Sequence, residues 1–171
     1  MEFKEYQQLT NRTNFCEYPY DNKCAIMVMG MYGEFFKIIE SANKNDLVRM
    51  ENVLGDILWY MSEYYTLRKY ELKSAEPSYK LVGTKETRSA MDLGVILLDF
   101  NYKLSSLQNM VKRAWICEEE INKSFEIDLL NDIHSCIGAI CFKYELNVRN
   151  IMKKNIKKLE LHYKDFLQNE E

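Results

Sequence analysis

The sequence contains very few residues that interrupt a helix. Its 171 residues include only six glycines and two prolines, which are the strongest local breakers of regular structure. A fold made of many short strands needs turn residues at short intervals. Apolar residues instead recur at spacings of three and four along most of the chain, which is typical of amphipathic helices. We therefore predict an all-α fold, a helical bundle that forms a single domain over residues 1–171.

The apolar spacing predicts about six helices. Pro19 and the Tyr-Asp-Asn sequence after it predict a loop between the first two helices. Asn45 or Asp46 is the expected N-cap of the third helix, because a short polar side chain can accept a hydrogen bond from the first turn. An Asn-Lys-Ser sequence at 122–124 predicts a turn before the fifth helix. The expected helices cover residues 2–15, 23–42, 46–65, 88–117, 128–144 and 147–166.

Two of the expected helices share a sequence pattern. Leu54–Leu72 and Leu130–Val148 both begin Leu-x-Asp-Ile, and both contain Tyr-Glu-Leu near the end. One interpretation is an internal duplication, with a connector where Pro77 and Gly83 interrupt the pattern. The other is that two amphipathic helices are alike by chance. The duplicated halves and their connector would be residues 1–72, 88–168 and 73–87.

Composition and charge exclude several classes of protein. The formal charge of −3 gives no sign of nucleic-acid binding. The longest uncharged run, Cys24–Gly33, is about half the length of a membrane span, so no transmembrane helix is expected. The five cysteines are odd in number and lack CxxC spacing, and the start MEFKEYQ is charged. We expect reduced, mostly buried thiols rather than a zinc site, and a cytoplasmic protein.

Two carboxylates on successive helices indicate a site for a divalent cation. Glu34 and Asp56 lie on either side of the polar turn SANKND, and hard cations such as Mg²⁺ prefer oxygen ligands. Asn52 lies one turn before Asp56 and could add a neutral oxygen. We therefore predict Glu34, Asn52 and Asp56 as ligands of Mg²⁺ or Mn²⁺. The alternative is an ordinary polar pair on a solvated face.

The segment around these carboxylates resembles the MazG-like, all-α nucleoside triphosphate pyrophosphohydrolases. GMYGE and LGDILWY, which contain Glu34 and Asp56, are similar to the family patterns GLxGExxE and EELGDxLWY. EYQQLTNRT is similar to the opening helix of the family. Asn155, Lys158, Leu159 and Tyr163 match its closing helix. However, Lys37 and Val53 stand where the family has glutamates.

The resemblance implies a MazG-like bundle with a homodimeric or pseudo-dimeric core and a nucleotide ligand. Family members bind Mg²⁺ with their carboxylates, and a metal-activated water then cleaves a nucleoside triphosphate to a monophosphate and pyrophosphate. Glu34 and Asp56 are the catalytic residues that it implies here. The remaining residues that we assign to nucleotide binding are Lys37, Trp59, Asn155, Lys158, His162 and Tyr163.

Three functions remain open at this stage. The chain could be an active pyrophosphohydrolase with a reduced ligand set, or a protein that captures a nucleotide without cleaving it. It could also be an interaction module with a vestigial pocket. Lys37 argues against hydrolysis, because an ammonium repels a metal and attracts a phosphate. Trp59 and Tyr60, in a cluster of four aromatic residues, could stack on a base or belong to the core. Lys158 could lie on a solvated basic face. In the second half, Asp128 and Asp132 could be a degenerate site or surface charge.

Overall fold

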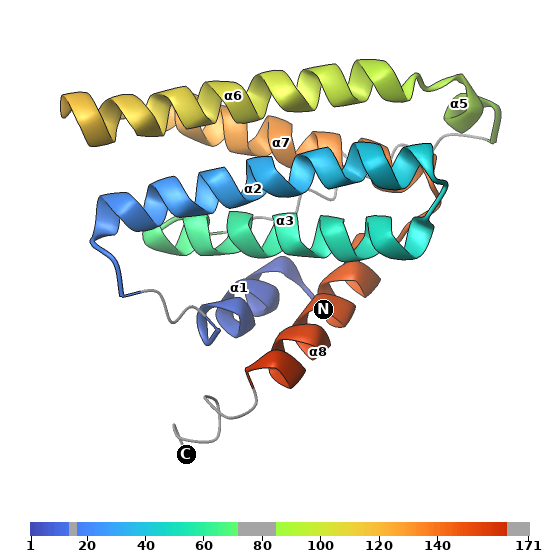
Figure 1. Cartoon of the computed structure of the whole chain (residues 1–171), viewed down its shortest axis with the longest axis horizontal. Helices are drawn as coiled ribbons and strands as arrows, with labels where there is room; N and C mark the ends of the chain where they lie inside the picture. The colour runs from blue at the N-terminus through green and yellow to red at the C-terminus, as the bar shows by residue number, and fades with distance from the viewer. Residues whose placement is uncertain (14–16, 72–84, 164–171) are drawn as a thin grey trace.

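The computed structural model describes residues 1–13, 17–71 and 85–163, which form seven α-helices and no strand (Figure 1). The all-α prediction is therefore confirmed for the described residues. None of the described helices combines the length and the apolar character needed to cross a membrane. The helices are α1 Phe3–Asn11, α2 Tyr20–Asn43, α3 Leu47–Leu67, α5 Lys85–Ala90, α6 Leu93–Cys117, α7 Lys123–Lys143 and α8 Val148–His162.

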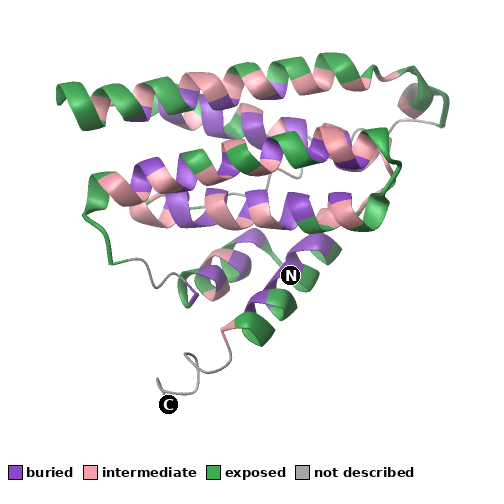
Figure 2. Cartoon of the chain, viewed as in Figure 1, coloured by how far each residue is buried: buried purple, intermediate pink, exposed green. Residues whose placement is uncertain are grey.

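The four longest helices form the centre of the molecule. The helices α2 and α3 make one hairpin, α6 and α7 make another, and α2 packs on α6 (Figure 1). The short helix α1 and the last helix α8 both pack against α3 on the side away from α6. Figure 2 shows that buried residues lie on the facing sides of these helices, while much of α6 is exposed. The side of α3 that meets α8 is where the candidate site forms.

The turn between α2 and α3 explains how two consecutive helices lie antiparallel. Asn45 has a φ of 50°, in the left-handed region that asparagine tolerates better than most residues. Asp46 then caps α3, because its side chain accepts a hydrogen bond from the backbone N–H of Arg49 at 2.9 Å. Of the two expected caps, Asp46 is therefore the N-cap and Asn45 closes the preceding helix.

The helix α7 repeats the bounds of α3 at a shift of 76 residues. Adding 76 to the bounds of α3 gives the bounds of α7. The N-caps Asp46 and Asn122 differ by the same number, and each accepts a hydrogen bond from the third residue of its helix. Lys69 and Glu145, again 76 apart, both have a φ of 57° just after their helices. The two helices thus begin and end by the same local geometry.

The shift of 76 also relates the buried faces of α2 and α6. The buried residues of α6 are Phe100, Leu104, Leu107 and Val111. Subtracting 76 from each gives four buried residues of α2, namely Cys24, Val28, Met31 and Phe35. Every buried position of α6 therefore has a buried counterpart in α2, which buries four further residues.

The prediction of one continuous helix over 88–117 is wrong at its beginning. Residues from Lys85 to Ala90 form the separate short helix α5, and α6 begins only at Leu93. The reason is a capping residue: the Asp92 side chain accepts a hydrogen bond from the backbone N–H of Gly94 at 2.7 Å and so begins a new helix. The predicted connector 73–87 consequently ends inside α5, and its residues 73–84 lie outside the described part of the chain.

Two other predicted helix starts are also wrong. The fifth predicted helix, 128–144, begins five residues earlier at Lys123, because Asn122 caps it. The Asn-Lys-Ser sequence is therefore the N-cap and the first two residues of the helix rather than a turn before it. The helix predicted over 23–42 begins at Tyr20, directly after Pro19. Proline tolerates the start of a helix, because no N–H is needed there.

The ends of the first and last helices differ from the prediction by a few residues. The first helix ends at Asn11 rather than at residue 15, and residues 14–16 lie outside the described part. The last helix ends at His162 rather than at residue 166. Residue 166 lies outside the described part of the chain. Among the described cysteines, Cys24, Cys136 and Cys141 are buried free thiols as expected, whereas Cys117 is exposed.

Candidate functional site

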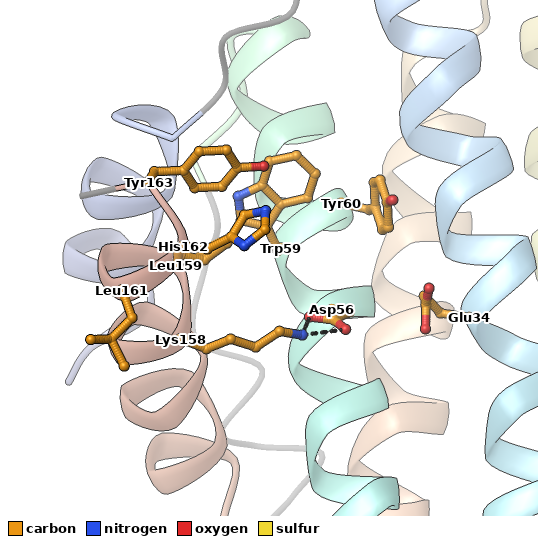
Figure 3. A pocket seen from close by; sticks show the side chains of 9 residues that line it. All are labelled: Glu34, Asp56, Trp59, Tyr60, Lys158, Leu159, Leu161, His162 and Tyr163. Carbon is orange, nitrogen blue, oxygen red and sulfur yellow. Dashed lines mark hydrogen bonds and ion pairs between the residues drawn. The ribbon is translucent and has the colours of Figure 1, made fainter. Parts of the chain in front are cut away.

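A cleft of about 600 Å³ opens where α8 meets the hairpin of α2 and α3 (Figure 3). Glu34 reaches it from α2 and Asp56 from α3, and the two carboxylates face the same space from neighbouring helices. The residues that line the cleft are Glu34, Asp56, Trp59, Tyr60, Lys158, Leu159, Leu161, His162 and Tyr163. The cleft therefore combines two acidic groups, one amine and several aromatic rings.

Asp56 is held by an amine from α8. The Nζ of Lys158 lies 2.6 Å from Oδ1 and 2.7 Å from Oδ2 of Asp56, so that the ammonium bridges both carboxylate oxygens. The side chain of Asp56 is 28% exposed and that of Lys158 is 50% exposed. Solvent reaches both groups and screens their attraction, so the pair can be opened at small cost.

Glu34 is neutralised by its neighbour on the same helix. The Nζ of Lys37, one turn further along α2, donates to Oε1 of Glu34 at 2.6 Å. This hydrogen bond is the main reason why the pKa of Lys37 is raised above its ordinary value. Lys37 itself does not line the cleft. Both cleft carboxylates thus already hold an ammonium group.

A chain of hydrogen bonds behind Asp56 fixes its position. The buried Tyr6 hydroxyl of α1 donates to Oδ1 of Asn155 at 2.8 Å, and the amide of Asn155 donates to Oδ1 of Asp56 at 3.2 Å. Burial, followed by the charge of Asp56, raises the pKa of Tyr6 well above its ordinary value, which keeps it a donor. Three helices therefore cooperate to aim one carboxylate into the cleft.

Four rings form an aromatic wall of the cleft, which we define as Trp59, Tyr60, His162 and Tyr163. The Trp59 ring meets the Tyr60 ring edge to face, with centroids 4.9 Å apart, and His162 meets Tyr163 in the same way at 4.9 Å. The indole N–H of Trp59 donates to Oγ1 of Thr13 at 2.9 Å. That bond fixes the ring, so that Trp59 offers the cleft an apolar surface.

Within the aromatic wall, Tyr60 is the ring on the side of Glu34 (Figure 3). Burial raises the pKa of Tyr60, and the charges of Glu34 and Asp56 raise it further, so its hydroxyl stays protonated. Its ring occupies the space left by Gly30 on α2, since a Cβ added at Gly30 would lie 2.3 Å from Cε1 of Tyr60. A glycine at this position therefore makes room for the wall.

Six of the predicted site residues line one cleft. These are Glu34, Asp56, Trp59, Lys158, His162 and Tyr163. Asn52 is exposed and does not line the cleft. Its spacing from Asp56 is right for one helical face, but the cleft begins only at the level of Asp56. Asn155 is 4% exposed and holds Asp56 from behind rather than facing the cleft.

Sequence reasoning missed several contributors to the site. Tyr60 was considered with Trp59 as a stacking ring but was not assigned to the site, although it lies one helical turn after Asp56 and so shares its face. Tyr6 and Gly30 carry no such signal, because their roles depend on contacts with other helices. Leu159 and Leu161 complete the lining from α8.

The donor set suits a cation that arrives with a phosphate better than a resident metal. Within the described residues, no group of three or more His, Cys, Asp or Glu side chains could hold an ion together. Glu34 and Asp56 are the two carboxylates of the cleft, and each is bonded to a lysine. Mg²⁺ is commonly bound by one or two carboxylates together with substrate phosphates and water. These residues fit such an ion only when a ligand supplies the remaining oxygens.

The corresponding positions of the second hairpin do not form the same constellation. Asp132 corresponds to Asp56 at the shift of 76, and it is paired with Lys103 of α6 at 2.7 Å. However, Met110 takes the place of Glu34, and Ser135 that of Trp59. The arrangement of acids and aromatic rings is therefore specific to the first hairpin.

Comparison of the chain with protein-family models, with curated proteins and with solved structures gives no match.

Proposed function

We propose that this chain binds a nucleotide in the cleft between α2, α3 and α8, as a divergent protein of the MazG-like type. The observation that carries the proposal is the meeting of two carboxylates, one amine and four aromatic rings in one cleft of about 600 Å³. A volume of this order is usual for small-molecule sites. Nucleotides offer a flat ring for the aromatic wall and phosphates for the charged end.

In this proposal the phosphate end lies beside Glu34, Asp56 and Lys158. Glu34 and Asp56 would hold a Mg²⁺ or Mn²⁺ ion, which neutralises phosphate charge and can activate a water when it is bound. Lys158 would turn from Asp56 to a phosphate oxygen, for which a flexible ammonium is well suited. Lys37 would keep Glu34 partly neutralised. The base would lie against the aromatic wall, where Trp59 contributes its ring face.

Capture without cleavage is the form of the proposal that the charges favour. The donor set contains two carboxylates, and a lysine is bonded to each of them. A second candidate is hydrolysis to a monophosphate and pyrophosphate. It is favoured by one observation, that Glu34 and Asp56 face the same space from neighbouring helices (Figure 3).

The shift of 76 between the hairpins supports a second part of the proposal, an internally duplicated core. Two hairpins whose second helices agree in bounds and N-caps, and whose first helices share four buried positions, can supply both halves of a four-helix core from one chain. In that arrangement the chain is a pseudo-dimer, and the site lies between the first hairpin and α8.

The test is titration calorimetry with a panel of nucleoside mono-, di- and triphosphates in the presence of Mg²⁺ or Mn²⁺. Asp56→Asn should weaken nucleotide binding at least about tenfold, equivalent to about 1.4 kcal/mol. Asp132→Asn is the matched control, because Asp132 is also paired with a lysine but lies in the second hairpin. It should leave the affinity within about twofold of the unchanged protein.

Release of monophosphate and pyrophosphate from the same panel distinguishes the two candidates. Turnover that Glu34→Gln abolishes would make the chain a pyrophosphohydrolase, and binding without turnover would make it a capture protein. If no nucleotide of the panel binds, with or without the metal, the proposal is wrong and an interaction module becomes the better hypothesis.

A further inference from the structure

The bond between Lys158 and Asp56 closes the position that a cation would take. The ammonium lies between both oxygens of the carboxylate, at 2.6 and 2.7 Å. Two carboxylates and one lysine ammonium line the cleft. A divalent ion that arrives alone must therefore compete with a positive group for Asp56.

We propose that Lys158 is an internal counter-ion that excludes a divalent cation from the cleft until a phosphate draws its ammonium away. This inference rests on the proposed function, because the phosphate is that of the bound nucleotide. It makes binding of the cation and of the phosphate cooperative. The phosphate draws Lys158 away from Asp56 and so frees the carboxylate for the cation, while the cation displaces Lys158 and so frees the ammonium for the phosphate. By linkage, the cation strengthens phosphate binding by the same factor.

The exposure of the pair agrees with a counter-ion that can be exchanged. Half of the Lys158 side chain is exposed, and its long flexible stem starts on the outer surface of α8. Asp56, in contrast, is held from behind by Asn155, which in turn is held by Tyr6. The carboxylate is therefore fixed while the ammonium is free to move.

The chain provides a matched control for this lysine. Lys154 lies one turn earlier on α8 and forms an ion pair with Glu51 of α3, so it joins the same two helices. Its side chain is 60% exposed, similar to that of Lys158. Neither Lys154 nor Glu51 lines the cleft.

The experiment measures Mn²⁺ binding by titration calorimetry without any nucleotide, for the unchanged protein, Lys158→Met, Lys158→Arg and Lys154→Met. Lys158→Met should bind Mn²⁺ about three- to tenfold more tightly, a factor limited by solvent screening of the pair. Lys158→Arg keeps a cation on Asp56 and should gain no affinity for Mn²⁺. Lys154→Met should behave as the unchanged protein does. Unfolding in urea checks that each variant is folded.

The same variants are then titrated with the Mn²⁺ complex of inorganic triphosphate. Here the effect of Lys158→Met on affinity should be the opposite, because the variant lacks the ammonium that the phosphate would bind. Its affinity for the triphosphate complex should fall about three- to tenfold. Opposite effects of one substitution on the ion and on the phosphate complex are a signature that mere destabilisation does not produce.

Two results would overturn the inference. One is that Lys158→Met binds Mn²⁺ no more tightly than the unchanged protein does. The other is that Lys154→Met gains as much affinity for Mn²⁺, which would show that the loss of any positive charge on α8 has the same effect. If Lys158→Met alone gains affinity for Mn²⁺ but no nucleotide binds the unchanged protein, the counter-ion role stands and the proposed function fails.

Discussion

Gly30 and Gly55 are the positions where a missing side chain shapes the cleft. A Cβ at Gly30 would lie 2.3 Å from the Tyr60 ring, and a Cβ at Gly55 would lie 3.1 Å from Cβ of Asn155. Gly55 thus lets α8 approach α3 closely enough for Asn155 to reach Asp56. Gly33 differs from both, because a Cβ there would meet nothing within 4 Å.

Gly30→Ala and Gly33→Ala therefore make a matched pair on one helix. Gly30→Ala must displace the Tyr60 ring from the aromatic wall, and we expect nucleotide binding to weaken about tenfold or more. Gly33→Ala should leave binding unchanged and stabilise the protein by about 0.5–1 kcal/mol, because alanine is the better helix former. Calorimetric titration and urea unfolding of both variants test this. Equal affinities for the two variants would show that Tyr60 does not contact the ligand.

At the scale of helices, α3 and α7 share their bounds but not the character of their buried positions. Met50 and Leu58 of α3 are fully buried apolar residues. The corresponding residues of α7 are Glu126 and His134, which are also buried. The second hairpin therefore places polar groups in the core where the first has apolar ones.

Glu126 is satisfied by a network that ties α7 to the end of α3. The guanidinium of Arg68 donates to both carboxylate oxygens at 2.8 Å, and the hydroxyls of Tyr64 and Tyr70 donate at 2.5 and 2.6 Å. Burial and the neighbouring carboxylate raise the pKa of both tyrosines, that of Tyr70 to about 12, so they remain donors. This network places the two hairpins relative to each other by directed bonds as well as by packing.

His134 makes stability depend on pH. Burial lowers its pKa to about 3, and its ring meets Phe3 edge to face. In the unfolded chain the pKa is about 6.5. The unfolded state therefore takes up a proton at higher pH than the folded state does, so the contribution of His134 is complete above pH 6.5 and is lost progressively as the pH falls towards 3.

The substitution that tests this is His134→Leu, which introduces the residue found at the corresponding position of α3. Urea unfolding should show the free energy of unfolding of the unchanged protein falling below pH 6.5 more steeply than that of the variant, by up to about 1.4 kcal/mol per pH unit. Parallel pH profiles would mean that the pKa of His134 is the same in the folded and the unfolded chain.

At the scale of the whole molecule, the two hairpins predict one site per chain. The second hairpin keeps Asp132 but has Met110 and Ser135 where the first has Glu34 and Trp59. In addition, α8 packs on α3 and supplies Lys158 to the first hairpin. Titration of the protein with the tightest-binding nucleotide should therefore give one ligand per chain of 20.4 kDa. A value of two would show that the second hairpin also binds.

Local rules determined the elements of this protein. The scarcity of glycine and proline and the helical spacing of apolar residues are enough to predict the all-α fold, and the capping residue Asp46 is visible in the sequence. Where the prediction was wrong, at Asp92 and Asn122, the error was again local: an N-cap lay inside a segment predicted as continuous helix or as turn.

The same local pattern identified Glu34 and Asp56 as candidate site residues, because two carboxylates on successive helices can face one another. Only the tertiary structure decided what surrounds them. It decided that Lys158 bridges Asp56 and that Asn155 and Tyr6 support it from behind. It also decided that Tyr60 fills the space above Gly30. The physical reason is that these contacts join residues up to 149 positions apart. A helix's own periodicity specifies which residues share a face, whereas the packing of whole helices specifies what that face meets.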